Sequence, residues 1–391
     1  MICMTRKIRS IACAAAMLVL ASKTDAEVHV RGDSAKTYNH LGLTLKARGD
    51  LDGAVRAYRR AIQFNPNEPT PHYNLGLALH ARGDLDGAIG EYRQTLRMNP
   101  DDADAHHNLG YALKGKGDLD GAVRAYRRAI QIRPDFAEAH HNLGVTLYAK
   151  GDPDSAIKAL RQALNLKPDL AAAHSSLGIA LKDKGDLDGA IEAYRQAIQV
   201  RPNDAEVHNN LGVALKHKGD CDGAIQAYRQ AIEIHPGLAE AHHNLGVALK
   251  EIGDLDDAIG ALRQAVRIKP DFVEAHNSLG LALYARGDCD DAIRAYRQAL
   301  RLKPHEASLH YNLGLALYAG GNLEGAVGAY LQALKLKPYD ADAHNSLGVA
   351  LKDRGDRESA LQEFRMYLRL STDEQEKQRA RDLIYELGGA P

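Results

Sequence analysis

Histidine and cysteine are the side chains of this sequence that could bind a metal ion or carry protons near neutral pH. Nine of the 18 histidines recur at a fixed interval of 34 residues, from His72 to His344. Adjacent pairs such as His106-His107 would point about 100° apart on a helix, which is not the i, i+4 arrangement of a helical zinc site. The four cysteines have no metal-ligand spacing either. We therefore predict no metal and no other cofactor, and we expect the recurring histidines to be partly buried on the packing face, in place of a bulky aromatic residue. The alternative is that acidification charges this column and loosens the packing.

Motifs that would mark a catalytic site are missing from the sequence. It contains no Walker A loop, no G-x-S-x-G nucleophile turn and no H-E-x-x-H zinc helix. We therefore predict no enzymatic activity and no catalytic residues.

Asparagine recurs on the same interval, two residues after the histidines. An Asn amide has two donors and one acceptor, so a row of amides can hold both the N–H and the C=O groups of an extended peptide. The alternative is that the amides bond only between neighbouring repeats. Four units have Ser176, Ser278, Ser346 or His40 instead. The predicted peptide-binding row consists of Asn74, Asn108, Asn142, Asn210, Asn244 and Asn312.

Two further rows flank the asparagines. Three residues after each Asn position the side chain is aliphatic or Tyr in every unit, and six residues after it the side chain is Lys, Tyr or His. An amide row, an apolar row and a Lys/Tyr row suit an extended polypeptide better than one small molecule, although the lysines could equally form a solvated face. The predicted flanking groove consists of Lys46, Lys114, Tyr148, Lys182, Lys216, Lys250, Tyr284, Tyr318 and Lys352.

Arginine forms another column, which runs from Arg59 to Arg365 and is interrupted by Leu331. Such a column could bind polyanions. Asp recurs almost as regularly nine and seven residues before each of these positions. We therefore favour ion pairing between repeats on a solvated face, where exposed pairs stabilise little.

The common interval of 34 residues marks an internal repeat. Leu-Gly recurs ten times, from Leu41-Gly42 to Leu347-Gly348, without insertion or deletion. If Ala35 is place 1 of the first repeat, ten repeats end at Glu374. Residues 27–34 are then a short linker, and residues 375–391 are a C-terminal capping helix and tail.

Each repeat is predicted to form two helices. Leu at places 7 and 11 gives the first helix a buried face, and places 2, 5, 6, 9, 12 and 13 lie on the opposite face. Gly and Asp at places 15 and 16 end the first helix and cap the second. The second helix carries an apolar stripe at places 20, 24, 27 and 28, and Pro at place 32 cannot continue it.

A repeat of 34 residues with Leu-Gly at places 7 and 8, Ala at 20, Tyr at 24, Ala at 27 and Pro at 32 resembles the tetratricopeptide repeat (TPR). The departure is place 4, where that family often has Trp or another aromatic residue. The resemblance implies an all-α, right-handed superhelical solenoid of ten helix-turn-helix units with a C-terminal capping helix, whose concave groove binds partners. The Asn row is similar to the asparagine ladder in the repeat arm of O-linked N-acetylglucosamine transferases, here without a catalytic domain.

The predicted function is that of a non-catalytic scaffold, which binds an extended polypeptide or assembles a complex through the concave face. One alternative is a substrate-recognition subunit, or a relic, of a glycosyltransferase similar to those transferases. Another is an envelope glycan-binding protein that stacks sugars on Tyr148, Tyr284 and Tyr318. A passive spacer is a third alternative.

The first 26 residues resemble a secretory signal peptide. Arg6, Lys7 and Arg9 precede an apolar run at residues 11–21 that is too short to span a membrane, and small residues follow. We therefore expect an exported, periplasmic or extracellular protein, or alternatively one tethered to the membrane by an uncleaved N-terminal segment. The net charge is −1, which argues against a nucleic-acid partner. The expected partner is a protein or peptide, and the mature chain is expected to have no membrane span.

Overall fold

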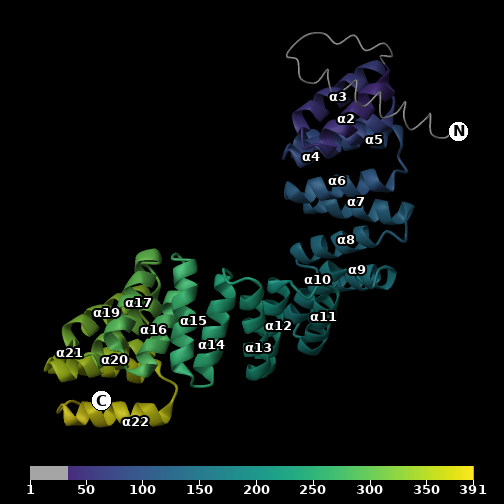
Figure 1. The fold of residues 1–391 in the computed structure, drawn as a ribbon. Helices are drawn as coiled ribbons and strands as arrows, with labels where there is room; N and C mark the ends of the chain where they lie inside the picture. The colour runs from purple at the N-terminus through teal and green to yellow at the C-terminus, as the bar shows by residue number, and fades with distance from the viewer. Residues whose placement is uncertain (1–33, 391) are drawn as a thin grey trace. The chain divides into compact units, whose positions relative to one another are not determined.

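The computed structural model describes residues 34–390, and every regular element in that range is an α-helix. The predicted signal peptide and the predicted linker up to residue 33 lie outside the described residues. The chain divides into two compact units, one ending at Pro168 and one beginning at Asp169, and each is a stack of paired helices (Figure 1). We call their described parts the first unit (residues 34–168) and the second unit (residues 169–390).

Even-numbered helices are the first helices of the repeats, and odd-numbered helices up to α21 are the second helices. The first unit contains α2 (Ala35–Ala47), α3 (Leu51–Phe64), α4 (Pro69–Ala81), α5 (Leu85–Met98), α6 (Ala103–Gly115), α7 (Leu119–Ile132), α8 (Ala137–Ala149) and α9 (Pro153–Leu166). The second unit contains α10 (Ala171–Asp183), α11 (Leu187–Val200), α12 (Ala205–Lys218), α13 (Cys221–Ile234), α14 (Ala239–Glu251), α15 (Leu255–Ile268), α16 (Val273–Arg286), α17 (Cys289–Leu302), α18 (Ala307–Ala319), α19 (Leu323–Leu336), α20 (Ala341–Arg354), α21 (Arg357–Leu370) and α22 (Glu374–Glu386). Ten pairs and a last helix confirm the predicted all-α repeat fold.

The Gly-Asp pair between the two helices of a repeat works as the sequence predicts. Gly49 has a φ of 83°, a left-handed conformation that side chains disfavour. The carboxylate of Asp50 then accepts the backbone N–H of Gly53 at 2.8 Å, which satisfies one free donor at the start of α3. The same bond joins Asp118 to Gly121 at the start of α7.

The glycine at place 8 makes room for the large side chain at place 24 of the same repeat. Tyr92 is fully buried, and a Cβ atom added to Gly76 would lie 2.6 Å from its Cε1 atom. Leu160 takes the same position over Gly144, and Phe364 takes it over Gly348. Because real Cβ atoms do not approach ring carbons this closely, the two helices of each repeat can only meet here through glycine.

The histidines at place 4 join successive repeats. Their Nε2 atoms lie within hydrogen-bonding distance of the carbonyl of the proline at place 32 of the preceding repeat, for example 3.0 Å between His106 and Pro100. The other such pairs within one unit are His72–Pro66, His140–Pro134, His208–Pro202, His242–Pro236, His276–Pro270, His310–Pro304 and His344–Pro338. These histidines therefore have a structural role, and the described residues place no three His, Cys, Asp or Glu side chains together around a possible metal ion.

The first helices lie on the inner side of the curve within each unit. In the first unit α2 packs against α4, α4 against α6 and α6 against α8, and the second unit repeats this from α10 to α20. Over the described residues, no second helix packs comparably against the second helix of the next repeat. Because the inner side of a curved stack is the more tightly spaced one, the face predicted to bind partners lies along the first helices.

The chain of the second unit ends with α22, which packs against α21. Its Ala380 and Ile384 are buried, and Leu383 and Leu387 pack against the same hydrophobic core. The predicted capping helix is therefore present, and it begins at Glu374, one residue before the predicted boundary. Over residues 34–390 we find no helix with the length and apolar character needed to cross a membrane.

Candidate functional site

The asparagines at place 6 bond to side chains at place 5 of the preceding repeat. Asn108 Nδ2 donates to the hydroxyl oxygen of Tyr73 at 2.8 Å, and Asn142 Nδ2 lies 2.8 Å from His107 Nε2. Asn74, Asn244 and Asn312 donate to the Oδ1 atoms of Asn39, Asn209 and Asn277 at 2.9, 2.9 and 3.1 Å. The bonding between repeats that the sequence left as an alternative is therefore present at five of the six asparagines.

The exception among the described asparagines is Asn210, which makes no such bond. The residue at place 5 before it is Ser175, whose side chain is shorter than Asn, Tyr or His. Serines at place 6 reach their neighbours only through long partners, as Ser278 does with His243 at 3.1 Å and Ser346 with Tyr311 at 3.3 Å.

Part of the hydrogen-bonding capacity of the Asn row remains open. Each bond between repeats uses one amide hydrogen, whereas an amide offers two hydrogens and an oxygen. For Asn74, Asn108 and Asn312, no donor to the amide oxygen is found within residues 34–390. Asn74 is buried and the others are half-buried. The row can therefore meet a peptide backbone with its oxygens and second hydrogens while it joins the repeats.

The apolar row at place 9 is more accessible than a core row. Its side chains are half-buried in most repeats, and Leu43 and Tyr111 in the first unit are 42% and 48% exposed. His80 stacks edge-on against Tyr111 with ring centroids 5.2 Å apart. This row therefore offers an apolar strip beside the amides.

The residue at place 13 of the next repeat decides whether a side chain of the Lys/Tyr row at place 12 has an acidic partner. Where that residue is acidic, it takes the side chain: Lys216 lies 2.9 Å from Glu251, and Tyr318 donates to Asp353 at 2.5 Å. In the last repeat Lys352 lies 4.0 Å from Glu386 of α22.

Three lysines of this row, Lys46, Lys114 and Lys250, have no ion-pair partner within the described chain. Burial lowers the pKa of Lys46 and of Lys114 because the charged form loses water. Lys182 lies 2.7 Å from its neighbour Asp183. The charges that remain available to an acidic group on a partner are therefore concentrated at Lys46 and Lys114 of the first unit and at Lys250 of the second.

The three tyrosines of place 12 are not flat, open platforms. Tyr148, Tyr284 and Tyr318 are half-buried and pack against the hydrophobic cores of their units. The hydrogen bond to Asp353, with burial, raises the pKa of Tyr318 to about 12. Since a sugar ring stacks on an exposed aromatic face, this packing disfavours the glycan-binding role.

Four of the six acidic side chains at place 2, Asp104, Glu138, Glu240 and Glu274, are paired within their own repeats. Asp104 lies 2.6 Å from Arg133, Glu138 lies 3.0 Å from Lys167, and Glu274 lies 2.9 Å from Lys303. The bond to Lys167 is the main reason that the pKa of Glu138 is lowered. These bases stand at place 31, where the repeats of Glu206 and Asp342 have His235 and Ser371 instead.

Comparison with known families gives matches along most of the chain. Residues 170–383 match the family described as the C-terminal domain of cilia and flagella-associated protein 70, whose short name labels it a TPR domain. Residues 42–83, 76–117 and 115–151 match a TPR repeat family, and residues 135–203 match a second tetratricopeptide repeat family. No curated protein is detectably similar to the chain.

Comparison with solved structures gives matches over parts of the chain. MamA is 28% identical with a TM-score of 0.40, over 42% of this chain and 97% of that chain. YrrB, described as a TPR protein with an unusual peptide-binding site, is 24% identical with a TM-score of 0.43, over 48% and 97%. PilF of Pseudomonas aeruginosa is 22% identical with a TM-score of 0.48, over 53% and 94%.

The family matches together run from residue 42 to residue 383, and one of them alone covers more than half of the chain. They coincide with the ten helix pairs and with the Gly-Tyr contact that recurs in most of them. With its 34-residue period kept through all ten pairs, the chain belongs to the tetratricopeptide-repeat family.

Proposed function

We propose that the protein is a non-catalytic interaction scaffold that binds an extended polypeptide along the first helices. The observation that carries this proposal is the composition of one face over residues 34–390: amides whose oxygens accept no hydrogen bond there, a half-buried apolar row, and lysines without acidic partners in that range. An extended peptide has backbone N–H and C=O groups at regular intervals, and the amides can bond to both.

The predicted resemblance to the repeat arm of O-linked N-acetylglucosamine transferases leaves a recognition subunit as the alternative. That role uses the same face and the same amides, so it differs in the partner rather than in the geometry. Export, if residues 1–26 act as a signal peptide, would place this interaction outside the cytoplasm.

A peptide array and a glycan array, both probed with the full-length chain, test the class of partner. We expect extended peptides to bind and sugars not to bind. Binding to glycans alone would overturn the proposal, and so would an absence of binding to both arrays.

A pair of matched variants then tests the role of the amides, with a peptide selected on the array as the probe. Asn108→Ala removes both the bond to Tyr73 and the amide, whereas Tyr73→Phe removes only the oxygen that accepts that bond. Because Asn108→Ala would lose one or two hydrogen bonds to the peptide, each contributing about 1 kcal/mol, we expect this variant to bind about 5-fold to 30-fold more weakly. Tyr73→Phe should change the affinity by less than about 2-fold.

Equal losses in the two variants would show that Asn108 acts only between repeats, and the amide row would then be excluded as a binding site. Circular dichroism of both variants provides the control for folding, because each substitution removes the same inter-repeat bond.

A further inference from the structure

The arginines at place 25 of the first unit form a column that the proposed function does not use. Arg59, Arg93, Arg127 and Arg161 lie on the second helices α3, α5, α7 and α9, away from the inner face. All four are exposed, and none forms an ion pair within 4.0 Å among the described residues; Arg127 lies near enough to Asp152 to contribute, after the hydrogen bonds from Ser155, to the lowered pKa of that carboxyl. We call these four residues the arginine column.

The predicted ion pairing between repeats is present in the first unit, but the acids at place 18 pair with bases other than these arginines. Asp at place 18 pairs with a base at place 14 of the next repeat, as Asp52 does with Arg82 at 3.0 Å and Asp120 does with Lys150. Asp at place 16 accepts the backbone N–H that caps the second helix.

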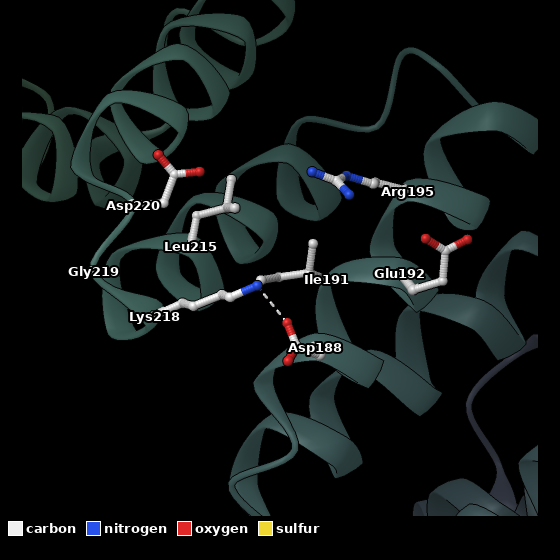
Figure 2. Close-up of a pocket in the computed structure, with 8 residues that line it drawn as sticks. All are labelled: Asp188, Ile191, Glu192, Arg195, Leu215, Lys218, Gly219 and Asp220. Carbon is white, nitrogen blue, oxygen red and sulfur yellow. Dashed lines mark hydrogen bonds and ion pairs between the residues drawn. The ribbon is translucent and has the colours of Figure 1, made fainter.

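Figure 2 shows the same arrangement in the second unit, around a shallow pocket between α11 and α12. Lys218 reaches across to Asp188 at 2.5 Å, and no interaction is drawn for Arg195. The base at place 14 thus pairs with the acid at place 18, and no ion pair of Arg195 is found within residues 34–390.

The charges around place 25 nevertheless differ between the two units. Place 22, one turn before the column on the same helix face, has Arg56, Arg124 and Lys158 in the first unit. In the second unit Arg263 at place 25 is neutralised by Asp291 at 3.1 Å, and Leu331 replaces arginine altogether.

The net charges of the two units have opposite signs. Residues 34–168 contain 19 basic and 15 acidic side chains, a net charge of +4. Residues 169–391 contain 26 basic and 33 acidic side chains, a net charge of −7. The near-zero charge of the whole chain therefore conceals a basic unit.

We propose that the arginine column binds an acidic segment of a partner polypeptide, at a second site distinct from the inner face. Arginine presents a planar fork of donors that matches a carboxylate with two bonds, and one such fork stands in each of four successive repeats. The partner we infer has Asp and Glu side chains spaced along its chain.

The acids at place 18 distinguish this partner from a nucleic acid. Asp52, Asp86 and Asp120 are 69%, 79% and 70% exposed and lie on the same helices as the column. Because each is paired with a base, these places add no net positive charge for the continuous phosphates of a nucleic acid, whereas a polypeptide can place neutral residues opposite them. Each of these acids is also held by the base of the next repeat, so they remain beside the column.

The test uses the full-length chain and a fluorescein-labelled, 20-residue peptide of alternating Glu and Ser, with binding measured by fluorescence anisotropy. The variant Arg59→Gln/Arg93→Gln/Arg127→Gln removes three charges from the arginine column. The matched control Arg195→Gln/Arg229→Gln/Arg297→Gln removes three charges from the same place in the second unit. A duplex DNA of 20 base pairs serves as the competing polyanion.

We expect the first variant to raise the Kd for the peptide at least about tenfold and the control to change it by less than about twofold. Binding should weaken as salt is added, because exposed charges are screened. Equal losses of affinity in both variants would show that binding depends only on the net charge of the chain, and this would overturn the proposal. Tighter binding of the DNA, lost with the same three arginines, would overturn it in favour of a nucleic acid.

Discussion

The contact between glycine at place 8 and the aromatic ring at place 24 predicts opposite effects of one substitution at two glycines of the second repeat. Gly76 lies in the middle of α4, against the buried ring of Tyr92. Gly90 lies in the middle of α5, is exposed, and would have no atom within 4 Å of an added Cβ. The matched variants are Gly76→Ala and Gly90→Ala.

The magnitudes follow from packing and from helix propensity. Alanine in place of glycine inside a helix stabilises by about 0.5–1 kcal/mol, and this is the whole effect expected at Gly90. At Gly76 the new atom would lie 2.6 Å from Tyr92 Cε1, and the ring is fully buried. Overpacking of this kind costs up to about 3 kcal/mol, which leaves a net destabilisation of about 2 kcal/mol.

Amide hydrogen exchange of peptides from the second repeat is the suitable assay, since each repeat of a solenoid contacts only its neighbours and can open locally. Protection in residues 69–98 should fall in Gly76→Ala and rise slightly in Gly90→Ala. Urea unfolding followed by circular dichroism gives the effect on the whole chain. If Gly76→Ala were as stabilising as Gly90→Ala, the Gly-Tyr contact could not be what holds the two helices together.

Two further predictions concern buried polar groups. The hydroxyl of Tyr126 is buried without a partner among the described residues, and Phe364 occupies the same place in the last repeat. Tyr126→Phe should therefore leave the thermal unfolding temperature unchanged or raise it, and a decrease of more than about 1 kcal/mol in the free energy of unfolding would contradict this. Burial lowers the pKa of His106 and of His243, so the unfolded chain binds protons at these histidines at a higher pH than the folded chain does. The free energy of unfolding should therefore decrease from pH 7.5 to pH 5.5, and an unfolding temperature that does not change over this range would refute this coupling of histidine protonation to unfolding.

The features that the sequence predicts well are those whose causes lie within one repeat. The left-handed glycine at Gly49 and the cap at Asp50 are adjacent, so their types and order indicate the turn directly. The apolar stripe that includes Tyr58 is read from the helical period. Because the same local pattern recurs ten times in register, it predicts the fold of the whole repeat region.

The features that the sequence hides are bonds whose two ends lie about one repeat apart. Asn108 and Tyr73 are 35 residues apart, and their equivalents in other repeats are Asn with His or Asn with Asn. Because the partner changes type from repeat to repeat, no uniform column marks it. Lys150 and Asp120 are 30 residues apart, so no residue near Asp120 in the sequence indicates its partner.

The uniform columns and the variable columns therefore have different meanings. Glycine at place 8 and histidine at place 4 recur because every repeat must pack against itself and against the next one in the same way. Such columns explain the fold, and their regularity leaves little room for differences between repeats.

Differences between repeats arise where a neighbouring place changes type. Lys216 is neutralised because place 13 of the next repeat is Glu251, whereas Lys46 has no ion pair within residues 34–390 because the equivalent residue is Ala81. The same logic leaves Arg59 free, since Gly87 stands where Asp291 neutralises Arg263. A change between a small residue and an acid, one repeat away, thus decides which cations of a regular solenoid remain available to a partner.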